Sequence, residues 1–245
     1  MLWYKSWREV RNVMLAGMGA MAAACVLIVW NEKTTRWNAD PQMSYVAYVW
    51  KSVYNSIGRD LFAMLAIILG SGGLLQEKAR GTSGFTLSLP VSRLRIVLTR
   101  AAMGYVGVLA IAAVPVAVVP LASRYVGESY PVGQCAGFFF LWAGAGAVFY
   151  GLTFLVAHRI ESEPVAVLIA VPLLMLYGAV LKLPWLARLR MFDLFSILNG
   201  EQMPFFNEGQ HRLVGPLPWL ALGIMLAIGA AFGRAAARRM EPLDF

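Results

Sequence analysis

Residues 76–100 read QEKARGTSGFTLSLPVSRLRIVLTR and form the most polar break between two apolar runs of the chain. The run before this stretch ends at Leu75, and the run after it starts near Ile96. The charged side chains of the stretch are Glu77, Lys78, Arg80, Arg93, Arg95 and Arg100. Because such charges are costly inside hydrocarbon, the stretch lies outside a bilayer that the flanking runs cross.

The middle of this stretch predicts a short helix of about two turns. Thr82 and Ser83, between two glycines, can cap a helix start, and Pro90 ends the helix at the residue before it. The apolar edge of this helix consists of Phe85, Leu87 and Leu89. An apolar edge too small to be a core, on a cationic loop, is typical of a docking contact for another protein.

The composition is that of an integral membrane protein. Hydrophobic residues make up 59% of the chain, charged residues make up 14%, and the mean hydropathy is +0.64, whereas soluble domains have roughly a quarter of charged residues. The 245 residues leave room for about six spans of about 20 residues and for no second soluble domain. The net charge is +8, but the basic residues flank apolar runs, where they contact lipid headgroups rather than nucleic acid.

We therefore expect an all-α integral membrane protein with six transmembrane helices in one domain, residues 1–245. The expected spans are 13–30, 52–76, 96–122, 132–157, 164–181 and 216–233. Between the last two spans, residues 182–216 predict a short amphipathic or re-entrant element before a flexible tip. With a cytoplasmic N-terminus, twelve Lys and Arg lie inside and nine outside. This count favours a multi-pass protein of the cytoplasmic membrane with both termini in the cytoplasm.

The N-terminal residues 2–11 have the pattern of an amphipathic helix that lies in the membrane interface. Trp3, Trp7 and Val10 share one helical face. The opposite face is basic and carries Lys5, Arg8 and Arg11. We interpret Trp3, Trp7, Lys5 and Arg8 as an interfacial anchor. A signal peptide is the alternative, but the apolar run that follows continues to Trp30 and is long for a signal core.

The second span raises a question about two ionisable residues. Its strongly apolar part, residues 61–75, is only fifteen residues long, so the span must include a turn or more from residues 51–60. Arg59 and Asp60 would then approach the membrane. An ionisable pair there is a candidate for a transport pathway or an interface, and a pair that snorkels to the outer surface is the alternative.

The polar stretch also resembles a known family. Glu77, Gly81 and then Leu87, Pro90 and Arg93 resemble the cytoplasmic loop after the second membrane helix of type 2 permeases of ATP-binding-cassette transporters. The resemblance implies that residues 77–95 are a coupling loop whose helix, residues 82–89, seats in a groove of a separate ATPase subunit.

The same resemblance implies roles for single residues and for partners. Glu77 would anchor the end of the second span, and Arg93 would fix the loop to the lipid headgroups or to the partner. Gly81 and Thr82 lie at the start of the loop helix, and Pro90 follows its end. Phe85 and Leu87 would be the inserted contacts. The protein would work as a dimer with a second permease copy or a homologous permease. ATP and Mg would be bound by the partner ATPase, export being the expected direction; the sequence names no substrate.

The chain lacks the usual signs of its own cofactor chemistry. No Gly-Lys dipeptide occurs, so a phosphate-binding P-loop is absent and this chain is not expected to be an enzyme. Neither of its two histidines, His158 and His211, has a second ligand at zinc spacing, and Cys25 and Cys135 lie in apolar runs. We expect no cofactor and no metal in this chain.

Two alternatives come from other classes of protein. Residues 81–84 read GTSG and match the G-x-S-G of rhomboid proteases, which makes an intramembrane serine hydrolase with Ser83 and His158 conceivable. Ser83 lies between Arg80 and Arg93, however, and His158 is followed by Arg159, so a capping role for Ser83 is preferred. A stand-alone transporter or channel could use only Arg59 and Asp60, and no inverted repeat supports it.

Overall fold

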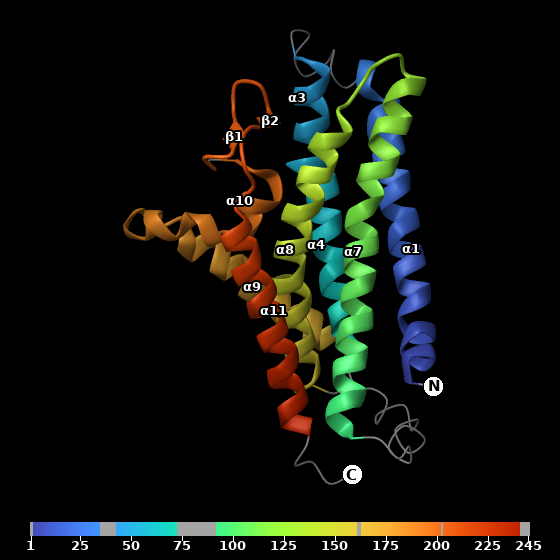
Figure 1. The fold of residues 1–245 in the computed structure, drawn as a ribbon, viewed down its shortest axis with the longest axis vertical. Helices are drawn as coiled ribbons and strands as arrows, with labels where there is room; N and C mark the ends of the chain where they lie inside the picture. Colours follow the sequence, from blue (N-terminus) through green and yellow to red (C-terminus); the bar gives the residue numbers. More distant parts are fainter. Residues whose placement is uncertain (1, 35–42, 73–91, 161–162, 202, 241–245) are drawn as a thin grey trace.

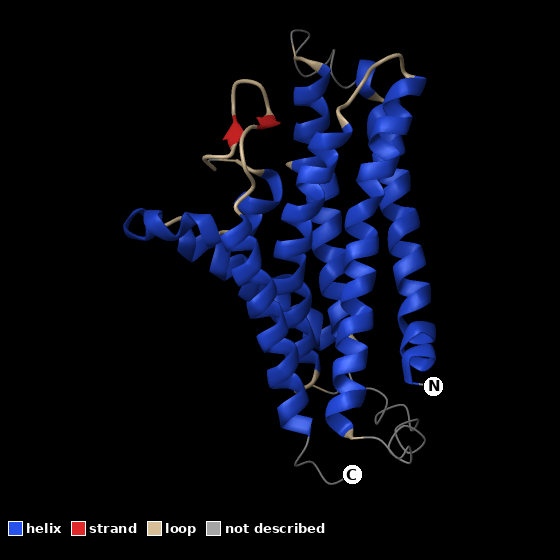
Figure 2. Ribbon diagram, viewed as in Figure 1, coloured by secondary structure: helices blue, strands red, loops and turns tan. Residues whose placement is uncertain are grey.

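The computed structural model describes residues 2–34, 43–72, 92–160, 163–201 and 203–240. Within these residues, six helical segments are long and apolar enough to cross a membrane. Most of them run side by side along the long axis of the molecule (Figure 1). Figure 2 shows that helices make up nearly all of the described chain, with one short hairpin at one end. The expected all-α membrane fold is therefore confirmed.

The first helix, α1 (Leu2–Trp30), is continuous over 29 residues. The predicted interfacial helix, residues 2–11, and the predicted first span, residues 13–30, both belong to this one helix. No proline or glycine separates them, so nothing local ends the helix near Asn12. At 1.5 Å per residue α1 is about 44 Å long, more than the hydrocarbon thickness of about 30 Å, so part of it extends beyond the membrane core.

The second span starts earlier than the sequence predicted. It consists of α3 (Tyr45–Val49), the π-helix η1 (Trp50–Tyr54) and α4 (Ile57–Ser71). Ser44 caps its start by accepting a hydrogen bond from the Ala47 amide at 3.2 Å. The predicted start at residue 52 is too late, because residues 45–54 are held by tertiary packing rather than by hydropathy. Helix α4 ends at Ser71, and the predicted end at residue 76 lies outside the described residues.

The other spans lie close to their predicted ranges. They are α7 (Arg93–Tyr125), α8 (Val132–Ala157), α9 (Glu163–Leu181) and α11 (Trp219–Met240). Helix α8 is central and packs against α4, α7, α9 and α11. Its buried aromatic side chains form the middle of the core: Phe138, Trp142, Phe149 and Phe154.

Small residues allow α8 and α11 to cross closely. A Cβ atom added at Gly229 would lie 2.5 Å from the carbonyl oxygen of Ala147, and one added at Gly151 would lie 2.8 Å from the carbonyl oxygen of Gly229. These distances are too short for any side chain. Gly151 of the fourth span therefore serves helix packing, as small residues commonly do in membranes.

The segment between the fifth and sixth spans is folded. It contains the 3₁₀ helix η2 (Pro184–Phe192), α10 (Leu194–Asn199), and the strands β1 (Phe206–Asn207) and β2 (Arg212–Leu213), which pair antiparallel. A short helical element is present, as predicted, and the predicted tip, residues 200–210, contains the first strand of the hairpin. This outer segment, residues 184–218, lies toward the end of the bundle opposite the chain termini (Figure 1).

Candidate functional site

The ends of four helices lie together at one end of the bundle, which we call the inner end. The first turn of α1, the end of α4, the first turn of α7 and the last turn of α11 lie there (Figure 1). The predicted coupling loop leaves the described chain after Gly72 and returns at Ser92. Its predicted contact residues lie outside the described residues: Glu77, Gly81, Thr82, Phe85, Leu87 and Pro90.

Helix α7 starts at Arg93, within the predicted loop of residues 77–95, so the last three residues of that loop are helical. The Oγ atom of Ser92 accepts a hydrogen bond from the Arg95 amide at 3.4 Å, which satisfies one of the unpaired amides of the first turn. Arg93, the last residue of the family-like pattern, is the first residue of the helix. The cap thus marks a defined point at which the predicted loop passes into a helix of 33 residues.

Three charged residues connect α1 with α7 at the inner end. A carboxylate oxygen of Glu9 lies 3.4 Å from Nη2 of Arg100, and the other lies 3.6 Å from Nζ of Lys5. The Arg100 side chain is only 14% exposed, and its Nη2 lies 3.9 Å from the position of a Cβ built on Gly72. One guanidinium group therefore adjoins α1, α7 and the end of α4.

His158 follows the last residue of α8 and is buried. Its Nδ1 lies 2.8 Å from the carbonyl oxygen of Phe154, and because a carbonyl only accepts, Nδ1 carries the proton. Burial, with a smaller contribution from the nearby charge of Arg100, lowers the pKa of His158 to about 4, so the imidazole is neutral at pH 7. Nε2 has no hydrogen-bond partner among the described residues; the proposed hydrolase partner Ser83 lies outside them.

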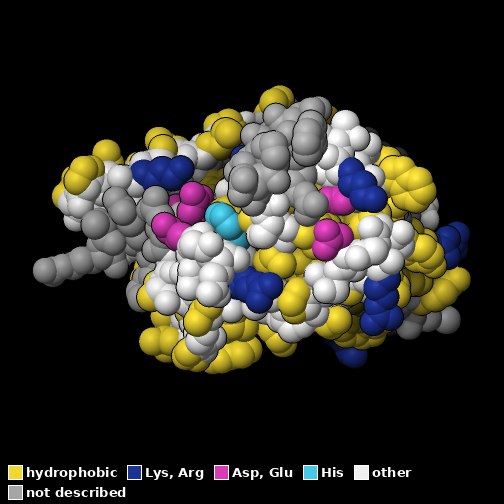
Figure 3. Space-filling view, turned by 90° about the horizontal axis from the view of Figure 1, so that it is seen from above, with side chains coloured by type: hydrophobic (Ala, Val, Ile, Leu, Met, Phe, Trp, Pro, Cys, Tyr) yellow, Lys and Arg dark blue, Asp and Glu magenta, His cyan; other side chains and the backbone are white. Residues whose placement is uncertain are grey.

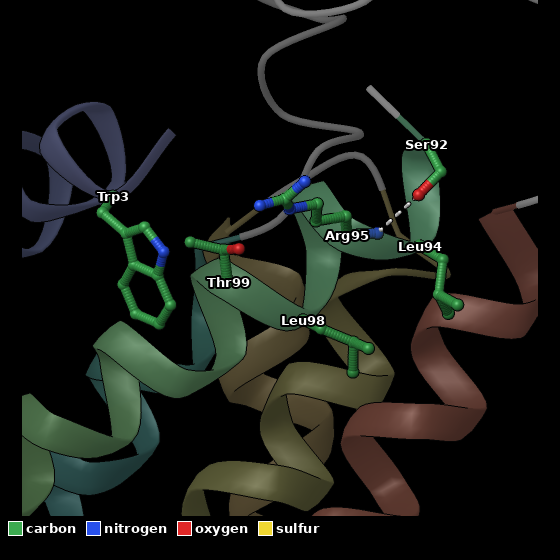
Figure 4. Close-up of a pocket in the computed structure, with 6 residues that line it drawn as sticks. All are labelled: Trp3, Ser92, Leu94, Arg95, Leu98 and Thr99. Carbon is green, nitrogen blue, oxygen red and sulfur yellow. Dashed lines mark hydrogen bonds between the residues drawn. The ribbon is translucent and has the colours of Figure 1, made fainter. Parts of the chain in front are cut away.

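The predicted interfacial anchor faces α7 as well as the surroundings. Trp3 and Arg8 are exposed, whereas Trp7 and Lys5 are partly buried. Trp3 and residues of the first two turns of α7 line a groove of about 340 Å³ (Figure 4). The apolar face of the first turns of α1 thus lies beside another helix. Its position in a lipid interface remains a prediction.

Arg59 and Asp60 belong to a polar network in the opposite half of the bundle. Nε of Arg59 lies 2.9 Å from Oδ1 of Asp60, and Nη1 of Arg59 donates to Oδ1 of Asn55 at 3.2 Å. The same Asn55 oxygen accepts from Nδ2 of Asn199 at 2.5 Å. The Asp60 side chain is 61% exposed and that of Arg59 is 20% exposed. The pair is therefore linked to the outer segment, a contact that the sequence did not indicate.

Aromatic side chains fix the outer segment on the spans. Nε1 of Trp50 donates to the carbonyl of Asn199 at 2.8 Å, and the Trp50 ring stacks on Phe206 and on His211. Nε1 of Trp142 donates to the carbonyl of Leu198 at 2.9 Å. Viewed onto this end, acidic and basic side chains are scattered among apolar ones rather than gathered in one patch (Figure 3).

The described residues hold no group of three His, Cys, Asp or Glu that could bind a metal ion. Cys25 and Cys135 are both buried and are not joined in a disulfide. The polar chemistry seen at either end of the bundle consists of ion pairs and hydrogen bonds between helices. Such contacts can hold helices together.

Within the described residues, six helices that are long and apolar enough to cross a membrane define the class of a multi-pass membrane protein. A family model described as "ABC-2 family transporter protein" matches residues 13–205. The match covers well over half of the chain, so the chain belongs to the ABC-2 transporter family and is an ABC transporter permease, a type of subunit that works with an ABC ATPase. Comparison with curated protein sequences gave no significant match.

Proposed function

We propose that this permease is the membrane-spanning part of an ATP-driven exporter of the cytoplasmic membrane. Two six-helix copies, or this chain and a homologous permease, would be moved by two ATPase subunits. One observation carries the proposal: α4 ends and α7 begins at the inner end, beside the start of α1 and the end of α11. The described chain stops at Gly72 and resumes at Ser92 at the same end of the bundle, and in this proposal a soluble subunit binds there.

The described contacts give a route by which a push on this chain would reach the spans. Ser92 caps α7, so displacement of the preceding residues acts on the start of a long helix. Arg100, two turns into α7, contacts Glu9 on α1. A displacement of α7 would thus be shared with α1 through this ion pair. In this proposal residues 82–89 receive the motion, and Arg93 and Arg100 lie on its path into the membrane.

Arg59 and Asp60 remain candidates for a pathway or an interface between the two permease copies. Their location supports this role, because Asp60 is exposed on the surface of the second span and Arg59 connects it to Asn55. The two side chains neutralise each other, so a substrate that displaces this pairing would have to carry its own charge or hydrogen-bonding groups.

The test is co-purification of the tagged chain from its native cell, followed by mass spectrometry of what stays bound. We expect a stoichiometric ATPase whose retention falls about thirtyfold or more in Phe85→Asp, since truncating a buried interface anchor typically costs about 2 kcal/mol or more. In the same variant, MgATP hydrolysis by the reconstituted complex should no longer drive transport.

Ile160→Asp is the matched control, because it places the same charge on the other connection at the inner end, between α8 and α9. This variant should keep the ATPase. Full retention of the ATPase by Phe85→Asp would remove residues 82–89 from the mechanism. A purified chain with no ATPase bound would contradict the proposed function as a whole.

A further inference from the structure

A groove lies between the first turn of α1 and the first two turns of α7, with a volume of about 340 Å³ (Figure 4). Its lining residues are Trp3, Ser92, Leu94, Arg95, Leu98 and Thr99. Leu94 and Leu98 are four residues apart and therefore share one face of α7, while Arg95 and Thr99 form the adjacent row. The groove thus combines an apolar strip with a cation beside it.

The apolar part of the groove is open to the surroundings. Trp3 is 55% exposed and Leu98 is 41% exposed, although both belong to helices that are long and apolar enough to span a membrane. Large exposed apolar side chains on such helices contact lipid tails. A hydrocarbon chain is therefore the natural neighbour of this strip.

The polar part of the groove is positively charged. Arg95 is exposed, and no ion pair of Arg95 occurs among the described residues. Residues 2–11 and 93–100 together contain six Lys and Arg and a single acid, Glu9. The carboxylate of Glu9 is engaged by Lys5 and Arg100. Among the described residues, no acidic side chain lines the groove, so the charge of Arg95 there favours an anion.

We propose that this groove binds one anionic phospholipid of the surrounding bilayer. The phosphate would contact the guanidinium of Arg95, and an acyl chain would lie along Leu94, Leu98 and the ring of Trp3. Tryptophan and basic residues at the end of a span gather at the depth of the headgroups, and basic pockets between membrane helices bind anionic headgroups. The charge complementarity selects an anionic lipid over a zwitterionic one.

The lipid would connect two helices. Trp3 lies on α1 and the other five lining residues lie at the start of α7, so one bound lipid contacts both. It would add to the contact between Glu9 and Arg100, which joins the same two helices further along. The site therefore stabilises the approach of α1 to α7 and does not depend on whether residues 82–89 bind an ATPase.

The test uses the whole purified chain, delipidated in a neutral detergent and titrated with phosphatidylglycerol or with phosphatidylcholine of the same acyl chains. Native mass spectrometry counts the bound lipids. We expect a preference for phosphatidylglycerol that Arg95→Gln lowers about fivefold or more, since one cation near an anionic surface has roughly that effect on affinity. Arg95→Lys should keep most of the preference for phosphatidylglycerol, and Trp3→Ala should weaken the binding of both lipids.

Arg234→Gln is the matched control, because Arg234 is an exposed cation near the end of α11, at the same end of the bundle as the groove but not among its lining residues. It should leave the titration unchanged. Equal losses in Arg95→Gln and Arg234→Gln would indicate a diffuse charge effect and would overturn the site. Equal binding of the two lipids by the native chain would overturn the assignment of an anionic lipid. If Arg95→Gln fails to fold, unchanged binding in Trp3→Ala would overturn the groove.

Discussion

Helices α1 and α7 are joined at both ends of the bundle, but by different chemistry. At the outer end, both are joined to α3: the Tyr48 hydroxyl donates to the carbonyl of Ile28 on α1 at 2.7 Å, and the Tyr45 hydroxyl bonds Ser123 on α7 at 2.6 Å. Both of these contacts are buried. At the inner end, the contact is an ion pair between Glu9 and Arg100 that is partly exposed.

The difference between these contacts indicates which ends of α1 and α7 can move relative to each other. Breaking a buried hydrogen bond leaves an unsatisfied polar group, at a cost of about 1–3 kcal/mol, so the outer contacts favour a single arrangement. The inner ion pair retains some access to water, with 29% of Glu9 and 14% of Arg100 exposed, and Lys5 is a second cation beside Glu9, so its members can exchange partners. The outer end therefore holds α1 and α7 in place, whereas the inner end permits them to shift.

The largest effect is expected at Trp142, in the core that the outer contacts surround. Its ring is fully buried, stacks on Phe62 with centroids 4.7 Å apart, and donates to the Leu198 carbonyl. Trp142→Ala should destabilise the protein by about 3–5 kcal/mol. The measurement is the thermal unfolding midpoint in detergent. Trp219→Ala, at an exposed tryptophan, is the control, and similar midpoints for the two variants would contradict this account of the core.

An intermediate effect is expected when the outer contacts lose their hydroxyls. The double variant Tyr45→Phe with Tyr48→Phe keeps both rings but leaves the Ile28 carbonyl and the Ser123 hydroxyl with fewer partners. Its stability should fall by about 2–3 kcal/mol, measured in the same way. Tyr125→Phe, at a tyrosine that is 88% exposed, should change nothing. A double variant as stable as the native protein would show that these bonds do not fix the outer end.

A smaller effect on stability, but a large one on coupling, is expected at the inner ion pair. Glu9→Gln should cost about 1–2 kcal/mol, because it keeps a hydrogen-bond acceptor beside the largely buried Arg100 but removes the negative charge, yet ATP hydrolysis by the complex should no longer move the membrane helices. The charge-reversed pair Glu9→Arg with Arg100→Glu should restore part of the coupling that either single change removes. Equal coupling in all four proteins would exclude this ion pair from the transmission of motion.

The smallest effect on stability is expected at the exposed ionisable pair of the second span. Arg59→Gln removes a contact with Asp60, whose side chain is largely exposed, and a hydrogen bond to Asn55, so stability should change by about 1 kcal/mol or less. If Arg59 lines the pathway, the transport rate or substrate preference changes all the same. An unaltered transport rate across several substrates would leave Arg59 as a surface residue only.

Much of the fold could be predicted from hydropathy. The fourth span was predicted at residues 132–157 and α8 occupies the same residues. The second span was misplaced because residues 45–54 are only moderately apolar and are buried by distant partners: Trp50 bonds the carbonyl of Asn199, 149 residues away. Contacts of that kind leave no local pattern, so sequence periodicity could not reveal them.

The candidate site was less predictable. Lys5 and Glu9 are four residues apart, a spacing that could have been read as a helical ion pair, but their link to Arg100 exists only once α1 packs on α7. The groove between Trp3 and Arg95 has the same origin. The coupling residues come from the family-like pattern and remain a prediction, because Glu77 to Pro90 lie outside the described residues.

We expect the inner ends of α1 and α7 to shift during the ATPase cycle while their outer ends do not. Cysteine pairs on these two helices test it directly, with Cys25 and Cys135 replaced by alanine: Tyr4→Cys with Leu98→Cys at the inner end, and Trp30→Cys with Tyr125→Cys at the outer end. These four native residues are exposed. In the reconstituted complex, MgATP with vanadate should change the cross-linking rate of the inner pair several-fold and leave that of the outer pair unchanged. A change confined to the outer pair, or none in either, would contradict the account.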